Sequence, residues 1–103
     1  MSDLIRKSAA ELVDLLASKQ VSSVEVTKAH LDRIAEVNPA INSYLHVTDE
    51  AALAVAADVD RRRAAGESLP LLAGLPIAVK DNLTTTDAPT TAGSKILEGW
   101  VPQ

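Results

Sequence analysis

The sequence contains no cysteine and no phenylalanine, and it has only one tyrosine and one tryptophan. The absence of cysteine excludes disulfides, thiol nucleophiles and cysteine-ligated zinc sites. The scarcity of aromatic residues leaves alanine, leucine and valine to fill the core, and these side chains fill little volume each. A core made from this chain alone would be thin, so we expect the chain to pack against a larger body.

The sequence also lacks an apolar run long enough to span a bilayer, and its first residues lack the apolar core of a signal peptide. The formal net charge of −4 excludes a general attraction to nucleic acid or anionic membranes. The one basic cluster, Arg61–Arg63, is interpreted as a solvated helix end, with phosphate binding as the minor alternative. His30 and His46 do not have the spacing of metal ligands. We expect a cytoplasmic protein without a metal or cofactor of its own.

Two amphipathic helices are predicted at the start of the chain. Ser8–Glu11 has the pattern of a capping box, and the helix that it opens should end near Ser18–Gln20. Ser22–Glu25 has the same pattern, and valines flank it where a hydrophobic staple would place them. The second helix should stop at Asn38-Pro39.

A third helix is expected to begin after Thr48, with an acidic first turn, and to end at Gly66. A short helix is expected over Ser94–Leu97. Two strands are predicted. Residues alternate between polar and apolar over Ile41–Val47, and an apolar run over Pro76–Val79 predicts a buried strand.

The order helix, helix, strand, helix, strand predicts an α/β fold with a mixed sheet covered by helices. Two strands do not make a self-sufficient sheet, so further strands are expected from residues outside this sequence. We therefore expect residues 1–103 to be the amino-terminal portion of one domain, with a helical prelude over 1–39. Residues 40–103 then hold the first strands, the third helix and the lysine segment.

Lys80 follows the apolar run directly and is the most reactive-looking group in the chain. A lysine is protonated at neutral pH because its ordinary pKa is about 10.4. Desolvation in an apolar pocket lowers the pKa of a lysine, and a neutral lysine can take a proton from a serine hydroxyl. On physical grounds alone, a lysine that extends into water or pairs with Asp81 is the more common outcome.

The surrounding motif changes that interpretation. Gly74–Asn82 and Thr90–Ser94 together closely resemble the lysine segment of the amidase signature family. Within that family, Ser94–Trp100 and residues 22–34 and 38–47 are most similar to the A subunits of glutamyl-tRNA(Gln)/aspartyl-tRNA(Asn) amidotransferases. The resemblance covers essentially the whole chain.

The resemblance implies that Lys80 is the lysine of a catalytic unit whose other members are a serine nucleophile and a second serine in a cis peptide. Asp81 and Asn82 match the motif and are expected to support the lysine loop. Gly93 and Ser94 are assigned the same supporting role, with helix capping as an equal alternative. The family's Gly/Ser-rich segment, which supplies both serines, does not occur in this sequence. We therefore expect an amino-terminal fragment in which the lysine is idle and hydrolysis does not occur.

The implied parent hydrolyses glutamine and releases ammonia for the amidation of a mischarged tRNA. Its partners would be the B and C subunits of the complex. A partner would use ATP and Mg²⁺, and tRNA would be contacted mainly through that partner. Two alternatives remain open. One is another amidase of the same family that acts on simple amides. The other is a non-catalytic docking module formed by the helices of Ser8–Ser18 and Ser22–Val37.

Overall fold

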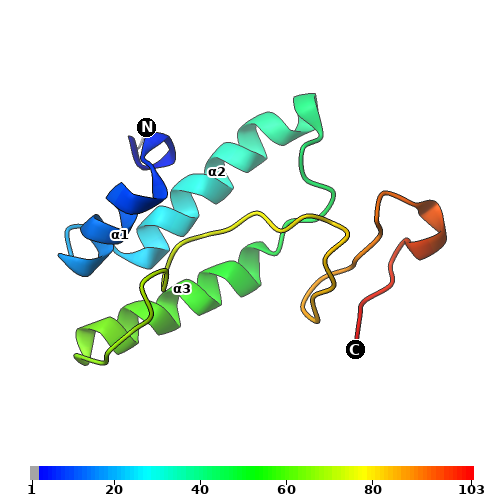
Figure 1. Ribbon diagram of the computed structural model, residues 1–103. Coiled ribbons are helices and arrows are strands. Elements are labelled where there is room, and N and C mark those ends of the chain that lie inside the picture. The colour runs from blue at the N-terminus through cyan, green and yellow to red at the C-terminus, as the bar shows by residue number, and fades with distance from the viewer. Residues whose placement is uncertain (1–2) are drawn as a thin grey trace.

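The computed structural model describes residues 3–103, and these residues form helices joined by long irregular segments (Figure 1). Three α-helices, α1, α2 and α3, and two short 3-10 helices, η1 and η2, follow one another in the order η1 (Asp3–Arg6), α1 (Ala9–Ala17), α2 (Ser23–Ile41), α3 (Asp49–Ala64) and η2 (Lys95–Leu97). Helices α2 and α3 lie side by side, and the following segment runs back along them (Figure 1). No helix in the described residues is long and apolar enough to cross a membrane.

Helix α1 begins with the predicted capping box. The backbone N–H of Glu11 donates to Ser8 Oγ at 3.2 Å, and the backbone N–H of Ser8 donates to Glu11 Oε2 at 2.7 Å. The backbone N–H of Ser8, followed by its hydroxyl, holds the pKa of the Glu11 carboxyl below its usual range. The helix ends at Ala17 with Ser18 as its C-cap, next to the predicted end near Ser18–Gln20, and the chain leaves it through Lys19, which has a positive φ of 60°.

Helix α2 is capped in a way that the sequence pattern did not reveal. Ser22 Oγ accepts the N–H of Glu25, but the reciprocal bond of the predicted second capping box is not formed in the described residues. Asp60 on α3 instead accepts the next two backbone N–H groups. The N–H of Ser23 donates to Asp60 Oδ1 at 2.7 Å and the N–H of Val24 donates to Asp60 Oδ2 at 3.0 Å. The start of α2 is therefore stabilised by a carboxylate from another helix.

The predicted stop of α2 at Asn38-Pro39 is wrong, and so is the predicted strand over Ile41–Val47. Helix α2 continues through Pro39 to Ile41, and Asn42 then takes the left-handed conformation with φ of 51°. The Asn38 side chain accepts the N–H of Tyr44 at 2.9 Å and donates to the Tyr44 carbonyl at 3.1 Å. Because a side chain occupies both backbone groups of Tyr44, these groups are not free for strand pairing.

Helix α3 starts after Thr48 and ends before Gly66, as predicted, although the Thr48 side chain makes no capping bond. The N–H of Gly66 donates to the carbonyl of Arg63, and the N–H of Glu67 donates to that of Arg62. This is a Schellman motif, in which the positive φ of 81° at Gly66 is one that glycine adopts without a steric penalty.

The hydrophobic core lies where α1 meets the start of α2. Leu16 and Val26 are 1% and 0% exposed, Leu12 is also buried, and four partly buried side chains pack against them: Leu4, Leu15, Val21 and Leu75. The inclusion of both Val21 and Val26 in one cluster agrees with the predicted hydrophobic staple.

Leu75 reaches this core because the returning segment is fastened to the helices. Ser23 Oγ donates to the Gly74 carbonyl at 2.8 Å, and an Arg63 guanidinium N–H donates to the Ala73 carbonyl at 3.1 Å. Gly74 has a φ of 93°, and a Cβ added there would lie 3.1 Å from Ser23 Oγ. Glycine is therefore required at this contact for both conformational and steric reasons.

The predicted buried strand over Pro76–Val79 is also wrong. Residues 76–80 are irregular, and Ile77 and Val79 are 85% and 51% exposed. A strand needs a neighbouring backbone to pair with, and no strand occurs anywhere in residues 3–103. The mixed sheet of the predicted α/β class is therefore not found, and the described fold is helical.

Candidate functional site

Lys80 lies where the extended segment 76–80 ends in a turn. Its side chain is exposed, and its carbonyl accepts the N–H of Leu83 at 3.0 Å, which closes the turn. Figure 1 shows this stretch of the chain leaving the helices and entering the separate loop that contains η2. The segment that carries the lysine predicted as catalytic thus leads away from the helices.

The next residue, Asp81, joins the lysine turn to the later part of the loop. The N–H of Thr91 donates to Asp81 Oδ1 at 2.8 Å, and the Thr91 hydroxyl donates to Asp81 Oδ2. The N–H of Ala92 also donates to the Asp81 backbone carbonyl at 2.8 Å. Side chain and backbone of Asp81 are therefore both held by residues ten or more positions further along the chain.

These bonds stabilise the ionised form of the Asp81 carboxyl. The hydroxyl of Thr91 is the largest cause, followed by its backbone N–H, and together with the N–H of Gly93 they hold the pKa of Asp81 below its usual range. Since each donor interacts best with a charged acceptor, Asp81 is a carboxylate at neutral pH. Its role is that of a hydrogen-bond acceptor within the loop.

Thr90 holds the other end of the lysine turn and is one of the few buried polar residues. Its hydroxyl donates to the carbonyl of Leu83 at 3.4 Å, and its N–H donates to the carbonyl of Trp100 at 3.0 Å. Sequence reasoning assigned no role to Thr90 or Thr91. The pair of adjacent threonines after a loop-like tract was the available signal, because a threonine hydroxyl can bond to a distant backbone group.

Gly93 and Ser94 follow the residues that bond to Asp81. We call the bonds from Thr91 and Ala92 to Asp81 the clamp. Gly93 has a φ of 73°, and its N–H donates to Thr91 Oγ1 at 3.1 Å. Ser94 Oγ accepts the N–H of Ile96 at 3.2 Å and so caps η2 (Lys95–Leu97), which lies within the short helix predicted for Ser94–Leu97. The helix-capping alternative therefore describes Ser94. Asn82 is exposed, and its supporting role stays a prediction.

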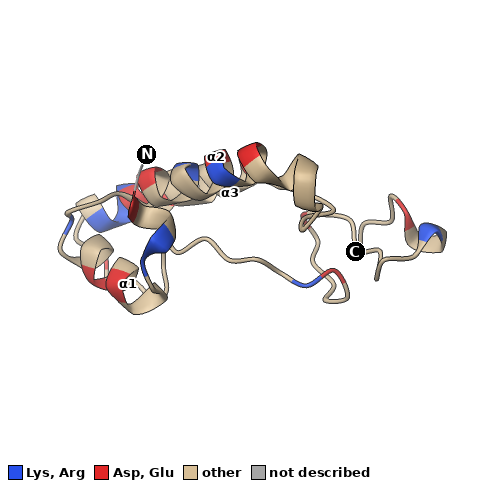
Figure 2. Cartoon of the chain, turned by 90° about the horizontal axis from the view of Figure 1, so that it is seen from above, with Lys and Arg blue, Asp and Glu red and all other residues tan. Residues whose placement is uncertain are grey.

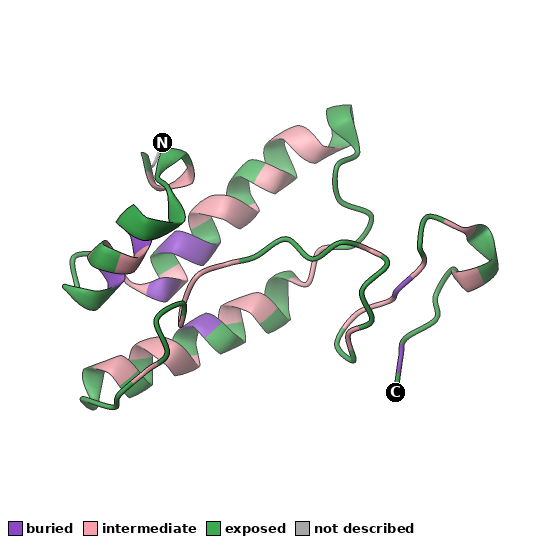
Figure 3. Cartoon of the chain, in the orientation of Figure 1, coloured by how far each residue is buried: buried purple, intermediate pink, exposed green. Residues whose placement is uncertain are grey.

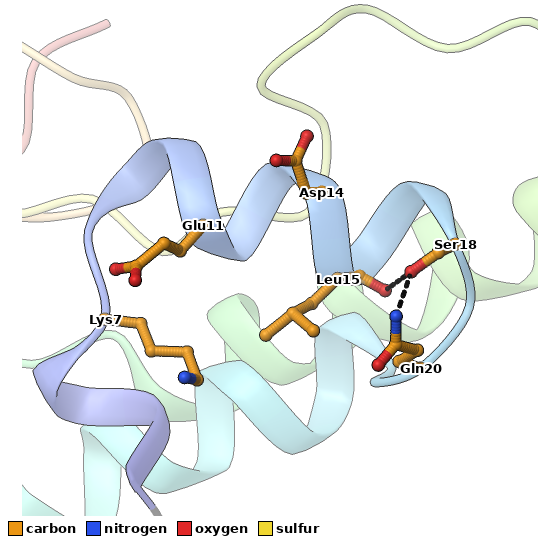
Figure 4. Close-up of a pocket in the computed structure, with 6 residues that line it drawn as sticks. All are labelled: Lys7, Glu11, Asp14, Leu15, Ser18 and Gln20. Atoms are coloured by element: carbon orange, nitrogen blue, oxygen red, sulfur yellow. Dashed lines mark hydrogen bonds between the residues drawn. The ribbon is translucent and has the colours of Figure 1, made fainter.

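Two shallow hollows in the structure lie among the helices and not around Lys80. One, of about 350 Å³, is lined by Lys7, Glu11, Asp14, Leu15, Ser18 and Gln20 (Figure 4). In it, Gln20 Nε2 donates to Ser18 Oγ, which in turn donates to the carbonyl of Leu15. The other, of about 330 Å³, lies over the start of α2 beside Asp60 and Arg63. Within residues 3–103 no three metal-binding side chains gather.

The distribution of charge separates the lysine loop from the helices. Figure 2 shows acidic and basic residues concentrated along α1, α2 and α3, with few in the carboxy-terminal loop. Several of the helical charges pair with each other, as in the ion pair between Lys28 and Asp32. Exposed pairs of this kind contribute little to stability. Lys80 is therefore one of a small number of charges in an otherwise neutral loop.

Comparison with known proteins gives a consistent result. The profile of the amidase family matches residues 25–103. The A subunit of the glutamyl-tRNA(Gln) amidotransferase of Acidothermus cellulolyticus is 58% identical over 99% of the chain, and that of Paenarthrobacter aurescens is 62% identical over 96% of the chain. The chain spans about a fifth of the length of these curated relatives, 20% in each case.

A solved structure is also similar. It is described as a vestigial protein complex that reveals the evolutionary origins of an s-triazine catabolic enzyme. Its sequence is 38% identical, its TM-score is 0.87, and the match covers 94% of this chain and 21% of that chain. An inhibitor-bound form of the same complex matches equally well. The arrangement of helices and loops described above is therefore one that a related protein also adopts.

Proposed function

Because the chain belongs to the amidase family, we propose that it supplies the lysine of a glutamine-hydrolysing subunit in a tRNA-dependent amidotransferase. The observation that supports this choice within the family is the identity of 58% and 62% to two subunits of that name over nearly the whole chain. The chain matches only part of those relatives, so the activity belongs to the larger protein.

In the proposed reaction Lys80 is the base. A neutral lysine amine accepts a proton from the cis-serine hydroxyl, which in turn removes the proton from the nucleophilic serine. The nucleophilic oxygen bonds to the side-chain amide carbon of glutamine, the C–N bond breaks, and ammonia leaves with the returned proton. Water then hydrolyses the glutamyl ester to glutamate and restores the serine.

This chain alone is proposed to be inactive. Both serines belong to a Gly/Ser-rich segment that does not occur in the sequence. Lys80 is also exposed in the described structure, whereas a lysine base needs apolar walls that favour its neutral form. Ammonia release from glutamine by the purified 103-residue chain should stay at the level of buffer, and a rate above that of an identically prepared Lys80→Ala chain would contradict this.

The proposed partners are the B and C subunits of the complex. One of these partners would use ATP and Mg²⁺ and make the main contact with the mischarged tRNA, which agrees with the net charge of −4 on this chain. Co-purification with both subunits, tested in the complete protein, is the direct measurement. Assembly with neither would remove the tRNA-dependent part of the proposal.

The decisive test of the base is Lys80→Ala in the complete protein. Mass spectrometry after mixing with glutamine should detect the glutamyl ester in the wild type and in Lys95→Ala, a matched change at an exposed lysine of the same loop. Lys80→Ala should give no ester and still assemble with its partners. An ester at the wild-type level in Lys80→Ala would exclude the proposed role.

A second candidate function is the hydrolysis of simple amides without tRNA. It is favoured by the solved structure at 38% identity, whose description concerns an s-triazine catabolic enzyme. The two functions differ in substrate, so the complete protein should be assayed with glutamine and mischarged tRNA and, separately, with small aryl and alkyl amides. Turnover of small amides in preference to glutamine would favour the second candidate.

A further inference from the structure

We propose that Thr91 is a positioning residue for Lys80, which it holds in place through the carboxylate of Asp81. This inference rests on the proposed function, since it concerns how the lysine of that site is held. Thr91 does not act on the substrate. Its contribution is to fix the turn from which the lysine side chain extends.

The first argument is the lack of support from the preceding segment. Residues 76–80 are irregular, and Ile77 and Val79 are largely exposed, so the chain before Lys80 does not hold the lysine in place within the described residues. Within residues 3–103, the contacts that can position Lys80 therefore lie on its other side. The residues that follow it are the ones with long-range bonds.

The second argument is how those bonds are distributed. Three of them end on Asp81, two from Thr91 and one from the N–H of Ala92. A fourth joins the hydroxyl of Thr90 to the carbonyl of Leu83, at the far end of the same turn. The lysine turn is therefore fastened at both ends to residues 90–92, and Thr91 supplies the two bonds to the charged group.

The third argument concerns the Thr91 hydroxyl itself. It accepts the N–H of Gly93 at 3.1 Å while it donates to Asp81. Accepting from one side and donating to the other orients the hydroxyl hydrogen toward the carboxylate, and a bond to an ionised acceptor is stronger than a neutral one. Serine can reproduce this arrangement, whereas valine has the same shape and cannot.

Catalysis by a general base depends on its position, and a displacement of about 1 Å can lower a rate by about 10²-fold. We therefore expect Thr91→Val in the complete protein to lower kcat for glutamine about tenfold, with KM changed by less than about twofold. Thr91→Ser should recover kcat to within about threefold of the wild type. The matched control is Thr84→Val, a change at an exposed threonine of the same loop, which should leave both constants unaltered.

A second measurement, on the 103-residue chain, detects the bonds between Thr91 and Asp81 and does not depend on catalytic activity. Thr91→Val should raise the pKa of the Asp81 carboxyl toward its ordinary range, since the largest cause of its lowering is removed. The N–H of Ala92 should exchange with solvent faster than in the wild type. Both are observable by NMR, and Thr84→Val should change neither.

The outcomes separate this inference from the proposed function. Wild-type kcat in Thr91→Val, together with lost activity in Lys80→Ala, overturns the positioning role and leaves the proposed function standing. Full activity in Lys80→Ala overturns the proposed function, and the positioning role falls with it. An equal loss in Thr91→Val and Thr91→Ser indicates a merely structural threonine and overturns the inference. If Thr91→Val does not fold, the kcat of Thr91→Ser decides, and a loss of more than about tenfold counts against the inference.

Discussion

Residues 3–75 and residues 76–103 are held together in different ways. In the first region, apolar side chains such as Leu16 and Val26 face one another, and hydrogen bonds such as those of Asp60 join segments far apart in the sequence. In the second region the bonds join residues within the same loop, and Ile96 is 92% exposed. Hydrogen bonds can define the path of a loop, but the burial of apolar side chains requires a second packed body.

The exposed area measures this difference. The chain has a solvent-accessible surface of 7260 Å², whereas a compact protein of its mass exposes about 5,500 Å². Its radius of gyration is 14.9 Å, against about 13 Å for a compact domain of this length. Figure 3 shows that the buried residues are mainly in α1, α2 and α3 and that exposed residues dominate much of the rest. The second region is much the shorter of the two, yet it includes half of the exposed large apolar side chains.

The largest expected effect on stability comes from removing a buried side chain from the hydrophobic core between α1 and α2. Leu16→Ala should lower the free energy of unfolding by about 2–5 kcal/mol, because it removes a buried side chain and leaves a cavity. Ile96→Ala is the matched control in the second region and should change it by less than about 0.5 kcal/mol. Urea denaturation followed by circular dichroism measures both. Equal effects would show that the two regions form one cooperative unit.

A smaller effect is expected from adding a methyl group to glycines with positive φ. Gly74→Ala brings a Cβ to 3.1 Å from Ser23 Oγ and 3.3 Å from Val59 Cγ1, so strain and close contact together should cost about 2–3 kcal/mol. Gly93→Ala has a φ of 73° but nothing within 4 Å of the added Cβ, so it adds only local strain of about 1 kcal/mol, and because the loop is outside the core this strain should not lower the free energy of global unfolding. Denaturation of both variants tests the difference, which disappears if Gly74 does not contact the helices in solution.

Acid should release the clamp of the second region and the capping box of α1, since the carboxyls of Asp81 and Glu11 both have a lowered pKa, but it should leave the apolar core in place. The pKa of Asp81 is lowered in the folded loop, so its clamp stabilises the loop above the ordinary value of about 3.9 and is lost as the pH falls through the lowered value. The burial of Leu16 and Val26 does not titrate. An NMR titration should show the N–H of Thr91 shifting with a midpoint below about 3.9, while the Leu16 methyl signals stay native. A midpoint at or above the ordinary value would refute the clamp.

The smallest expected effect on stability comes from placing glycine at positions where another residue has a positive φ. Lys19 ends α1 with a φ of 60°, so Lys19→Gly should relieve strain and stabilise the protein by about 0.5–1 kcal/mol. Ala92 has a φ of 51°, but the same change there should leave global unfolding unaltered because the loop is outside the core. Thermal denaturation of the two variants compares them directly. A gain from Ala92→Gly as large as that from Lys19→Gly would place the loop in the same folding unit.

The parts of the structure that the sequence predicted well are those specified within a few residues. The capping box of Ser8 and Glu11, the end of α3 at Gly66 and the cap of η2 by Ser94 all involve bonds between near neighbours. Their residue types and spacing contain the information that determines them. The resemblance that identified Lys80 was likewise carried by a continuous motif.

The predictions that were wrong concern properties that depend on distant residues. A strand is defined by its partner, and the apolar pattern of residues 76–79 does not specify whether a partner is present. Asp60 caps α2 from a position 37 residues beyond Ser23, and no spacing rule connects the two. The clamp between Asp81 and Thr91 was missed for the same reason, although both residues lie within the motif.

The cap that Asp60 provides for α2 also imposes an order on the folding of this protein during its synthesis. Ser23 leaves the ribosome 37 residues before the carboxylate that accepts its N–H. At a synthesis rate of about 5–20 residues per second, the start of α2 waits about 2–7 s for its cap. During that interval the first turn of α2 is incomplete, so the nascent chain can settle into its helical pair only after α3 has been made.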